Sequence, residues 1–140
     1  MENFHIPHMK KRLLKGKLAD PTVPERKLQL IPSDDIGAFV VAAFENPEKY
    51  VGLDIDIASD ELTNPEVAKV FSRVMVKPIQ FSKLPMLIVL LFMGKELHKM
   101  FRWINEVGYD VDIPALKQSF PEVELTTLEQ WLVADGWAKV

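Results

Sequence analysis

The stretch LDIDIASDELTNPEVAKVFSRV, residues 53–74, decides what kind of fold this chain adopts. Apolar and acidic side chains alternate along its first part, which predicts a half-buried strand at Leu53–Ala58. A capping box with proline in the first turn follows at Thr63–Glu66, and apolar residues then recur at helical spacing. The stretch therefore predicts a strand that leads into a well-capped helix from Pro65.

Two further short strands are predicted on either side of this stretch. Lys27–Ile31 alternates apolar and polar side chains, and Ile79–Ser82 is a short strand-like segment between two prolines. Residues 1–27 are expected to be irregular apart from one short helix, because two prolines near their end interrupt regular hydrogen bonding.

The remaining periodic segments predict helices, and the last of them opens with a second capping box, Thr126–Glu129. The chain is therefore mostly helical, with about three short strands whose edges must be paired or covered. The further helices are expected around Pro7–Leu14, Ile36–Phe44, Gly94–Val107, Asp112–Phe120 and Trp131.

Length and composition describe one globular domain and exclude several classes of site. The chain has 140 residues, of which 48% are hydrophobic and 26% charged. It has no cysteine, which excludes disulfides, thiolate zinc sites and a thiol nucleophile. The longest apolar run, Met86–Met93, is too short to span a bilayer. We expect a soluble, cytoplasmic protein that does not insert into membranes.

Charge is unevenly distributed along the chain. Residues 1–31 hold seven Lys/Arg against three Asp/Glu, and residues 32–140 hold ten against seventeen, so the net charge of −3 divides into +4 and −7. A nucleic-acid or membrane-surface contact is one interpretation of the basic cluster. We favour a solvated helix or loop, because the cluster is short and contains no aromatic residue. The cluster consists of Lys10, Lys11, Arg12, Lys15 and Lys17.

Two motifs of dinucleotide-dependent enzymes are missing. Successive glycines are at least fourteen residues apart, whereas a dinucleotide fingerprint or P-loop needs several within about eight residues. The Tyr-x-x-x-Lys pair of short-chain dehydrogenases is absent too, since Tyr50 is followed four residues later by Asp54, and Tyr109 by Ile113. We expect no catalytic residue in this chain.

Two of the three histidines have the spacing of metal ligands. His5 and His8 have a spacing that could bind a metal from a helix, but Pro7 lies between them and no third ligand is evident. His98 lies among charged residues of a predicted helix and is expected to be exposed. We expect no metal site.

An acidic group and an apolar group each allow two interpretations. The acidic group could act as acid and base or bind a cation, but a solvent-facing side is favoured; it consists of Asp54, Asp56, Asp60 and Glu61. The apolar group could line a ligand pocket, but at helical spacing it more often forms core; it consists of Met86, Phe92, Met93, Met100, Phe101 and Trp103.

Several segments, taken in order, resemble the second half of the NmrA-like family, also called the negative transcriptional regulator family, a group of atypical short-chain dehydrogenases/reductases. The strand-turn-helix Leu28–Phe39 contains the most recognisable element, Asp34-Asp35-Ile36-Gly37. The resemblance covers nearly the whole chain. The other matching segments are Glu2-Asn3-Phe4, Ala42–Tyr50, Gly52–Thr63, the helix from Pro65, Phe101–Asp112 and Thr127–Leu132.

The resemblance implies an α/β fold: the C-terminal part of an NAD(P)-binding Rossmann-type structure. Residues 1–140 would form a single substrate-side region without the Gly-rich half. Leu53–Ala58 would be the last strand of the Rossmann sheet, and Leu28–Ile31 and Ile79–Ser82 would pair in a small subdomain. Asp34 and Asp35 would act as helix caps.

The resemblance also implies what the chain binds. Glu2, Asn3 and Phe4 would lie near the nicotinamide end of the cofactor cleft. NAD(P) belongs to the complete family fold, and no cofactor is expected for this chain alone. The surface left by the missing half predicts a homo-oligomer or a partner protein, and no direct nucleic-acid partner is expected.

Three functions follow from the resemblance. The first is a segment that is non-catalytic by itself and forms the substrate- or partner-binding side of an NAD(P)-sensing transcriptional regulator, because family members are mostly redox sensors or regulators. The second is part of an atypical NAD(P)H-dependent reductase of quinones or other small carbonyl compounds. The third is a stand-alone protein-interaction module.

Overall fold

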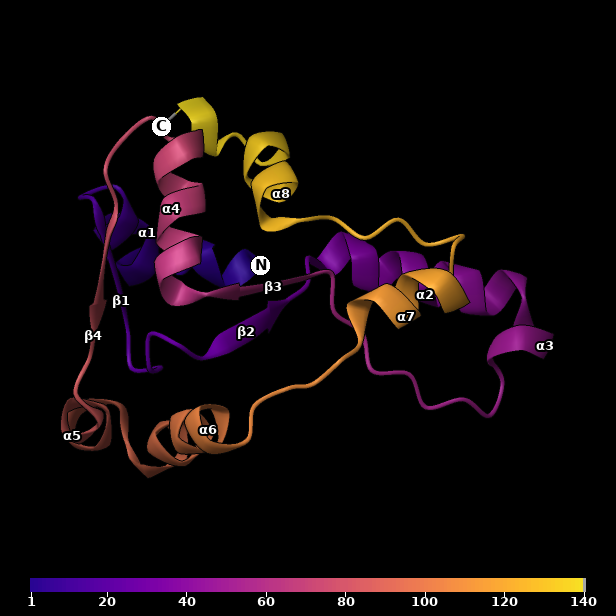
Figure 1. Ribbon diagram of the computed structural model, residues 1–140, viewed down its shortest axis with the longest axis horizontal. Coiled ribbons are helices and arrows are strands. Elements are labelled where there is room, and N and C mark those ends of the chain that lie inside the picture. Colours follow the sequence, from indigo (N-terminus) through magenta and orange to yellow (C-terminus); the bar gives the residue numbers. More distant parts are fainter. Residues whose placement is uncertain (140) are drawn as a thin grey trace.

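The computed structural model describes residues 1–139 and shows a mixed α/β fold that is mostly helical (Figure 1). No helix among these residues is both long and apolar enough to cross a membrane. The elements follow in the order η1 (Glu2–His5), α1 (Pro7–Leu13), β1 (Lys17–Asp20), β2 (Lys27–Leu30), α2 (Ser33–Glu45), α3 (Pro47–Tyr50), β3 (Asp60–Thr63), α4 (Asn64–Val74), β4 (Gln80–Lys83), α5 (Met86–Ile88), η2 (Val89–Met93), α6 (Lys95–Glu106), α7 (Ile113–Ser119), α8 (Leu128–Ala134) and η3 (Trp137–Lys139).

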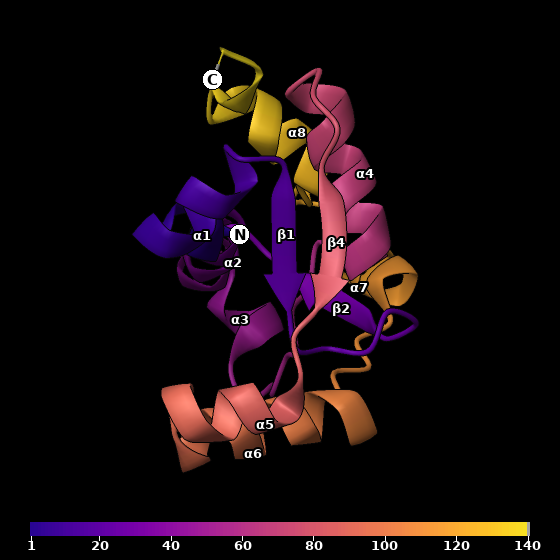
Figure 2. The ribbon, with the colours of Figure 1, turned by 90° about the vertical axis from the view of Figure 1, so that its left-hand side faces the viewer.

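The strands form two separate two-stranded sheets. β1 and β4 run parallel, with Leu18 opposite Phe81, and Figure 2 shows them side by side. β2 and β3 run antiparallel, with Leu28 opposite Leu62. The predicted strands at Lys27–Ile31 and Ile79–Ser82 are present as β2 and β4, but the predicted pairing between them is wrong. The partner of β4 is β1, which lies in the segment expected to be irregular.

The predicted strand at Leu53–Ala58 is wrong for this structure. Across residues 1–139, no backbone hydrogen bond involves residues 54–58, and regular pairing begins only at β3. The first bond after this segment runs from the Ser59 N–H to the Leu30 carbonyl, at 2.8 Å. A strand needs a neighbour to complete its ladder, and here the alternating segment has none.

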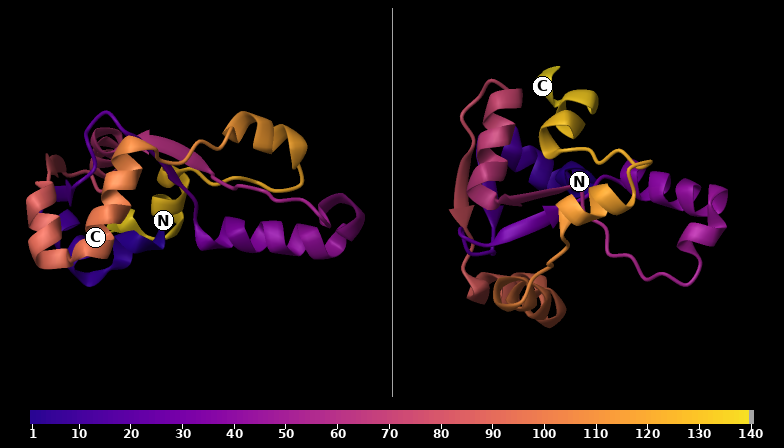
Figure 3. Two further views of the ribbon diagram at one scale, coloured as in Figure 1. Left: turned by 90° about the horizontal axis from the view of Figure 1, so that it is seen from below. Right: turned by 45° about the vertical axis from the view of Figure 1, so that its right-hand side comes forward.

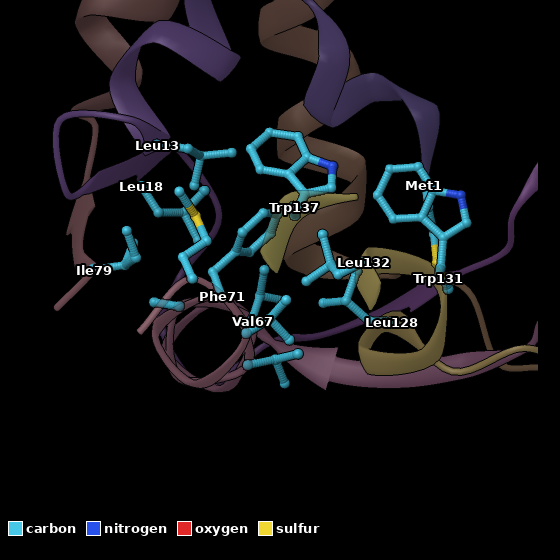
Figure 4. Packing of buried hydrophobic residues seen from close by; sticks show 14 residues of the cluster. Met1, Leu13, Leu18, Val67, Phe71, Ile79, Leu128, Trp131, Leu132 and Trp137 are labelled. Carbon is cyan, nitrogen blue, oxygen red and sulfur yellow. The ribbon is translucent and has the colours of Figure 1, made fainter. Parts of the chain in front are cut away.

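The larger of the two hydrophobic clusters surrounds α4. Its capping box is confirmed: the Thr63 hydroxyl accepts from the Glu66 N–H, and the Glu66 carboxylate accepts from the Thr63 N–H at 2.8 Å. Phe71 is fully buried and packs edge-on against Phe4 and Trp137, with ring centroids 4.9 and 5.2 Å away. Figure 4 shows the side chains from α1, β1, α4, α8 and η3 that converge on this cluster.

A second cluster joins α2 and α3 to α7 and the segment that follows α7. Phe120 packs against Phe39 and Tyr50, with ring centroids 5.9 and 5.1 Å away, and Leu116 and Val123 complete the contact. Both views in Figure 3 show α2 and α3 projecting from the rest of the molecule. The outer side of α2 is therefore left uncovered, and Phe44 there is 84% exposed.

Two predicted helix starts differ from the structure. α8 does open with a capping box, but one residue later than predicted, with Thr127 and Gln130 as the reciprocal pair. Asp34 and Asp35 do not cap α2, since Pro32 holds the N-cap position and both aspartates lie in the first turn. Their charges still favour the positive end of the helix.

Asp35 has a different structural role, as a buried junction between distant segments. Only 3% of it is exposed, and its carboxylate accepts from the Ser59 hydroxyl at 2.6 Å. It also accepts from the Thr126 N–H at 2.7 Å and from the Thr126 hydroxyl at 2.8 Å. One carboxylate thereby joins α2 to the segment before β3 and to the segment before α8.

We predict that Asp35→Asn lowers the free energy of unfolding by about 1–3 kcal/mol, because the amide turns an N–H₂ group toward donors that need an acceptor. Urea unfolding followed by tryptophan fluorescence measures the change. Asp34→Asn is the matched control: Asp34 lies in the same helical turn but is exposed, so its loss costs well under about 1 kcal/mol. Equal losses in the two variants would show that helix-end charge, and not the junction, explains the effect.

Candidate functional site

A hollow of about 500 Å³ lies between α1, β1 and the helices α5, η2 and α6; we call it the α1–α6 pocket. In Figure 2 the carboxyl ends of β1 and β4 point toward α5 and α6. Ligands of α/β proteins commonly bind at this end of parallel strands. The apolar side chains of the lining are Met9, Leu18, Ala19, Pro21, Leu84, Ile88, Phe92, Met93 and Phe101.

Helix geometry explains why α1 contributes three of the lining residues. Pro7 starts the helix at a position where its missing N–H does no harm. His8 and Arg12 are four residues apart and therefore share one face, with Met9 beside them. Lys17 follows at the start of β1. The pocket thus has an apolar wall and a basic rim.

The basic residues of the rim have no acidic partner within the part of the chain that the structure describes. Within residues 1–139, no salt bridge or side-chain hydrogen bond involves the side chains of Arg12, Lys17 or His8. Asp20 also lines the pocket, but its carboxylate accepts from the Thr22 N–H at 2.8 Å and from the Asn64 amide at 3.1 Å. The rim is therefore net positive.

The methionines and aromatics of α5, η2 and α6 do not form core, so that prediction is wrong. Val89 is fully buried, but Phe92 is 81% exposed, and no residue of α6 is buried. The amphipathic pattern of α6 creates an apolar face, and within residues 1–139 this face is at most partly covered. Phe92, Met93 and Phe101 instead line the α1–α6 pocket. This agrees with the less favoured interpretation of the apolar group, that it lines a ligand pocket.

The residues expected near nicotinamide, Glu2, Asn3 and Phe4, form η1 and do not line the α1–α6 pocket. Burial raises the pKa of Glu2, but hydrogen bonds from Ser33, including its N–H at 2.9 Å, outweigh burial and lower the pKa to about 2. Phe4 packs against Phe71 in the core. Glu2 and Phe4 thus anchor the N-terminal turn, and their proximity to a cofactor stays a prediction.

His5 and His8 lie in different environments. His5 Nε2 is 2.6 Å from the Asp135 carboxylate, and its ring packs against Trp131 and Trp137. His8 instead lines the α1–α6 pocket. Among residues 1–139, no three histidine or acidic side chains come together in a way that could hold a metal ion.

The acidic group is divided between structural bonds and solvent. The Asp60 carboxylate accepts from the Leu128 N–H at 2.9 Å and so fixes the start of α8. Glu61 pairs with Lys27 at 2.8 Å. Asp54 and Asp56 are exposed, as the solvent-facing interpretation predicts.

Tyr50 lies beside Lys49, whose ammonium group is 5.7 Å from the ring centroid, but the chemistry of Tyr50 is opposite to that of a catalytic tyrosine. Its hydroxyl donates to Glu122 at 2.6 Å, and Lys49 donates to the same carboxylate at 2.8 Å. Burial and then the bond to Glu122 raise the pKa of Tyr50 to about 12. A catalytic tyrosine needs a lowered pKa, so this cluster is structural.

A second hollow, which we call the α2 groove, separates α2 from residues 53–57, of which 54–57 make no backbone hydrogen bond within residues 1–139. It is lined by Ile36, Phe39, Val40, Ala43, Tyr50, Leu53, Ile55 and Ile57. Val40 and Leu53 are 49% and 57% exposed. The α2 groove therefore combines an uncovered apolar helix face with unpaired backbone.

The sequence contains one signal for the α1–α6 pocket. His8 and Arg12 have the spacing of one helical face, which the solvated interpretation of the basic cluster does not take into account. The sequence pattern gives no sign that Lys17, Leu18 and Asp20 belong to the site, because nothing in it predicts the strand β1. Only the fold brings β1 next to α5 and α6.

Comparisons with known proteins identify relatives by sequence and by structure. A sequence model of the NmrA-like family matches residues 1–132. No curated protein matches. The structure is similar to that of a nucleoside-diphosphate-sugar epimerase from Staphylococcus aureus, with a TM-score of 0.71 and 18% identity over 93% of this chain and 48% of that chain. This chain therefore spans about half the length of that epimerase, and the likeness shows the fold alone.

We predict that Glu122→Gln lowers the melting temperature at pH 7, and that the difference from the wild type closes as the pH falls toward 2. Hydrogen bonds from Lys49 and then Tyr50 hold the pKa of Glu122 at about 2, below its ordinary value of 4.5. A lowered folded-state pKa stabilises the fold above pH 4.5, and this contribution is lost as the pH falls through about 2.

Melting curves followed by circular dichroism from pH 2 to pH 7 test this expectation. Glu124→Gln serves as the control, because Glu124 is exposed and only two residues away. A pH-independent difference between Glu122→Gln and the wild type would contradict the assigned pKa.

Proposed function

The chain belongs to the NmrA-like family, and from this premise we propose that it is the substrate- or partner-binding side of an NAD(P)-sensing regulator, non-catalytic by itself. The observation that carries this proposal is the unpaired segment 54–58 beside the uncovered face of α2. A dinucleotide-binding Rossmann half, in the same polypeptide or in another, would complete both.

The segment 54–58 has the properties of an edge strand without its neighbour. Its backbone N–H and C=O groups make no backbone hydrogen bonds within residues 1–139, and its apolar side chains Ile55 and Ile57 face the α2 groove. Rossmann sheets are covered by helices on both faces. A strand added at this edge, with its sheet against α2, would cover Val40 and Leu53 and satisfy the free backbone groups.

A second copy of the chain is a poorer occupant of this edge. If two copies paired antiparallel through residues 54–58, Asp56 of one would lie directly opposite Asp56 of the other, with both Asp54 side chains on the same face. Like charges directly opposite in a sheet are destabilising. A strand of different sequence, with neutral or basic side chains opposite the aspartates, avoids this cost.

The residues present do not fit a dinucleotide by themselves. A pyrophosphate needs a Gly-rich turn that leads into a helix N-terminus, whereas the only glycine of α2, Gly37, lies inside the helix. Near the predicted nicotinamide end of the cofactor cleft, Glu2 carries a negative charge and Phe4 packs against Phe71 in the core. NAD(P) binding therefore belongs to the completing half, as in the family at large.

A reductase part is the second candidate, and the α1–α6 pocket favours it. The pocket is mostly apolar, contains a few polar groups, and lies at the carboxyl ends of two parallel strands. A quinone or other small carbonyl compound would bind there, and the completing half would supply NAD(P)H. Oxidation of NADPH by the completed protein with a quinone would establish this function over that of a sensor.

We expect the native protein from its source cells to include a dinucleotide-binding half. Intact-mass measurement should give either one chain of about twice 16.0 kDa, or a 16.0 kDa chain that copurifies with a second polypeptide containing a Gly-rich dinucleotide-binding loop. Either form should bind NADPH. A 16.0 kDa monomer or homodimer that binds no dinucleotide would refute the proposal and favour the stand-alone interaction module.

The α2 groove gives a sharper test in the completed protein. We predict that Val40→Asp weakens association of the two halves, or destabilises their contact in a single chain, because it buries an unpaired carboxylate. Val133→Asp is the control, since Val133 is similarly exposed, at 58% against 49%, but lies on α8. Equal effects on NADPH affinity and on association would show that the groove is not the contact surface.

A further inference from the structure

We propose that the α1–α6 pocket binds an anionic amphiphile, a small molecule with a carboxylate or phosphate group on an apolar tail. This proposal rests on the proposed function, because it takes the α1–α6 pocket to be on the substrate side. It names the chemistry of the ligand that the chain's own residues would recognise.

The wall of the pocket is suited to an apolar tail. Leu18 at its floor is 2% exposed, and Met9, Met93 and Phe101 surround the hollow of about 500 Å³. This volume lies in the usual range for small-molecule sites. Methionine side chains are flexible and polarizable, so they can adapt to a tail of variable shape.

The rim is suited to an anionic head group. Arg12 offers a planar fork of donors that matches a carboxylate or phosphate, and Lys17 and His8 add donors nearby. None of the three has an acidic partner within residues 1–139. The one acidic residue of the lining, Asp20, is already hydrogen-bonded to Thr22 and Asn64.

The charge of the whole chain concentrates anion attraction at this place. Residues 1–31 carry +4 and contain all three basic residues of the rim, whereas residues 32–140 carry −7. An anion is therefore repelled by most of the chain and attracted to the N-terminal part. The mouth also offers apolar surface, since Phe92 and Ile88 are 81% and 42% exposed, and a tail that covers them removes this surface from water.

Equilibrium dialysis of the full chain tests the proposal with dodecanoate and dodecyl phosphate, each below its micelle concentration. We expect one molecule to bind per chain. Dodecanol and dodecylamine carry the same tail with a neutral or a cationic head, and we expect them to bind at least about tenfold more weakly. Equal binding of all four probes would overturn the proposal, because an apolar surface alone would explain it.

Variants locate the site and separate head from tail. Arg12→Gln and Phe92→Ser should each weaken dodecanoate binding several-fold while the melting curve stays unchanged, since both side chains are exposed. Lys15→Gln and Phe44→Ser are the controls: these side chains are also exposed but lie outside the lining. Equal losses in the controls would place the binding elsewhere and overturn the assignment.

Two outcomes separate this assignment from its alternatives. Binding to phosphatidylglycerol vesicles without binding of monomeric dodecanoate would replace the pocket ligand by a membrane surface and overturn the proposal. The assay contains neither NADPH nor a second half, so its failure leaves the proposed function standing. Dodecanoate binding in a protein that never binds a dinucleotide would refute the proposed function alone.

Discussion

The buried carboxylate of Asp35 is the constraint on which the arrangement of this chain depends. Its two oxygens accept hydrogen bonds from Ser59 and Thr126. As a result, α2, the end of the unpaired segment and the start of α8 meet at one point. Asp60 reinforces the junction by accepting from the Leu128 N–H. A buried charge is tolerated only when its hydrogen bonds are complete. The two hydrophobic clusters, which share no buried residue, are thereby joined through polar contacts.

This junction gives the two candidate surfaces separate supports. The α1–α6 pocket rests on α1 and β1, which belong to the cluster around Phe71, whereas the α2 groove rests on the cluster around Phe120. Asp35 and Ser59 connect α2 to β2, since the Leu30 carbonyl accepts from the Ser59 N–H and Leu30 packs against the cluster around Phe71. A sensor that links a dinucleotide to a substrate or partner needs a connection of this kind.

Local signals predicted much of the fold, and non-local contacts explain the errors. The capping box at Thr63 is complete within four residues, so α4 could be predicted from sequence alone. The strand β1 could not, because its stability comes from pairing with β4, some sixty residues later. Thr126 and Thr127 both suit an N-cap; the Asp35 carboxylate, far away in sequence, binds Thr126 and leaves Thr127 to cap α8. The α1–α6 pocket cannot be predicted from local sequence for the same reason, since β1 forms part of its lining.

The segment 53–58 shows how a correct pattern can give a wrong structure. Its alternation is that of a half-buried strand, and its apolar side chains do line the α2 groove while Asp54 and Asp56 face solvent. Only the backbone hydrogen bonds to a neighbouring strand are absent, because a β-strand forms its hydrogen-bond ladder with a partner strand. The alternating sequence and the uncovered α2 face are the two features that the proposed neighbouring strand would complete. The aspartates further specify that this neighbour should not be acidic opposite them. The same alternation that misleads about this segment's pairing is therefore the basis for the proposed neighbour.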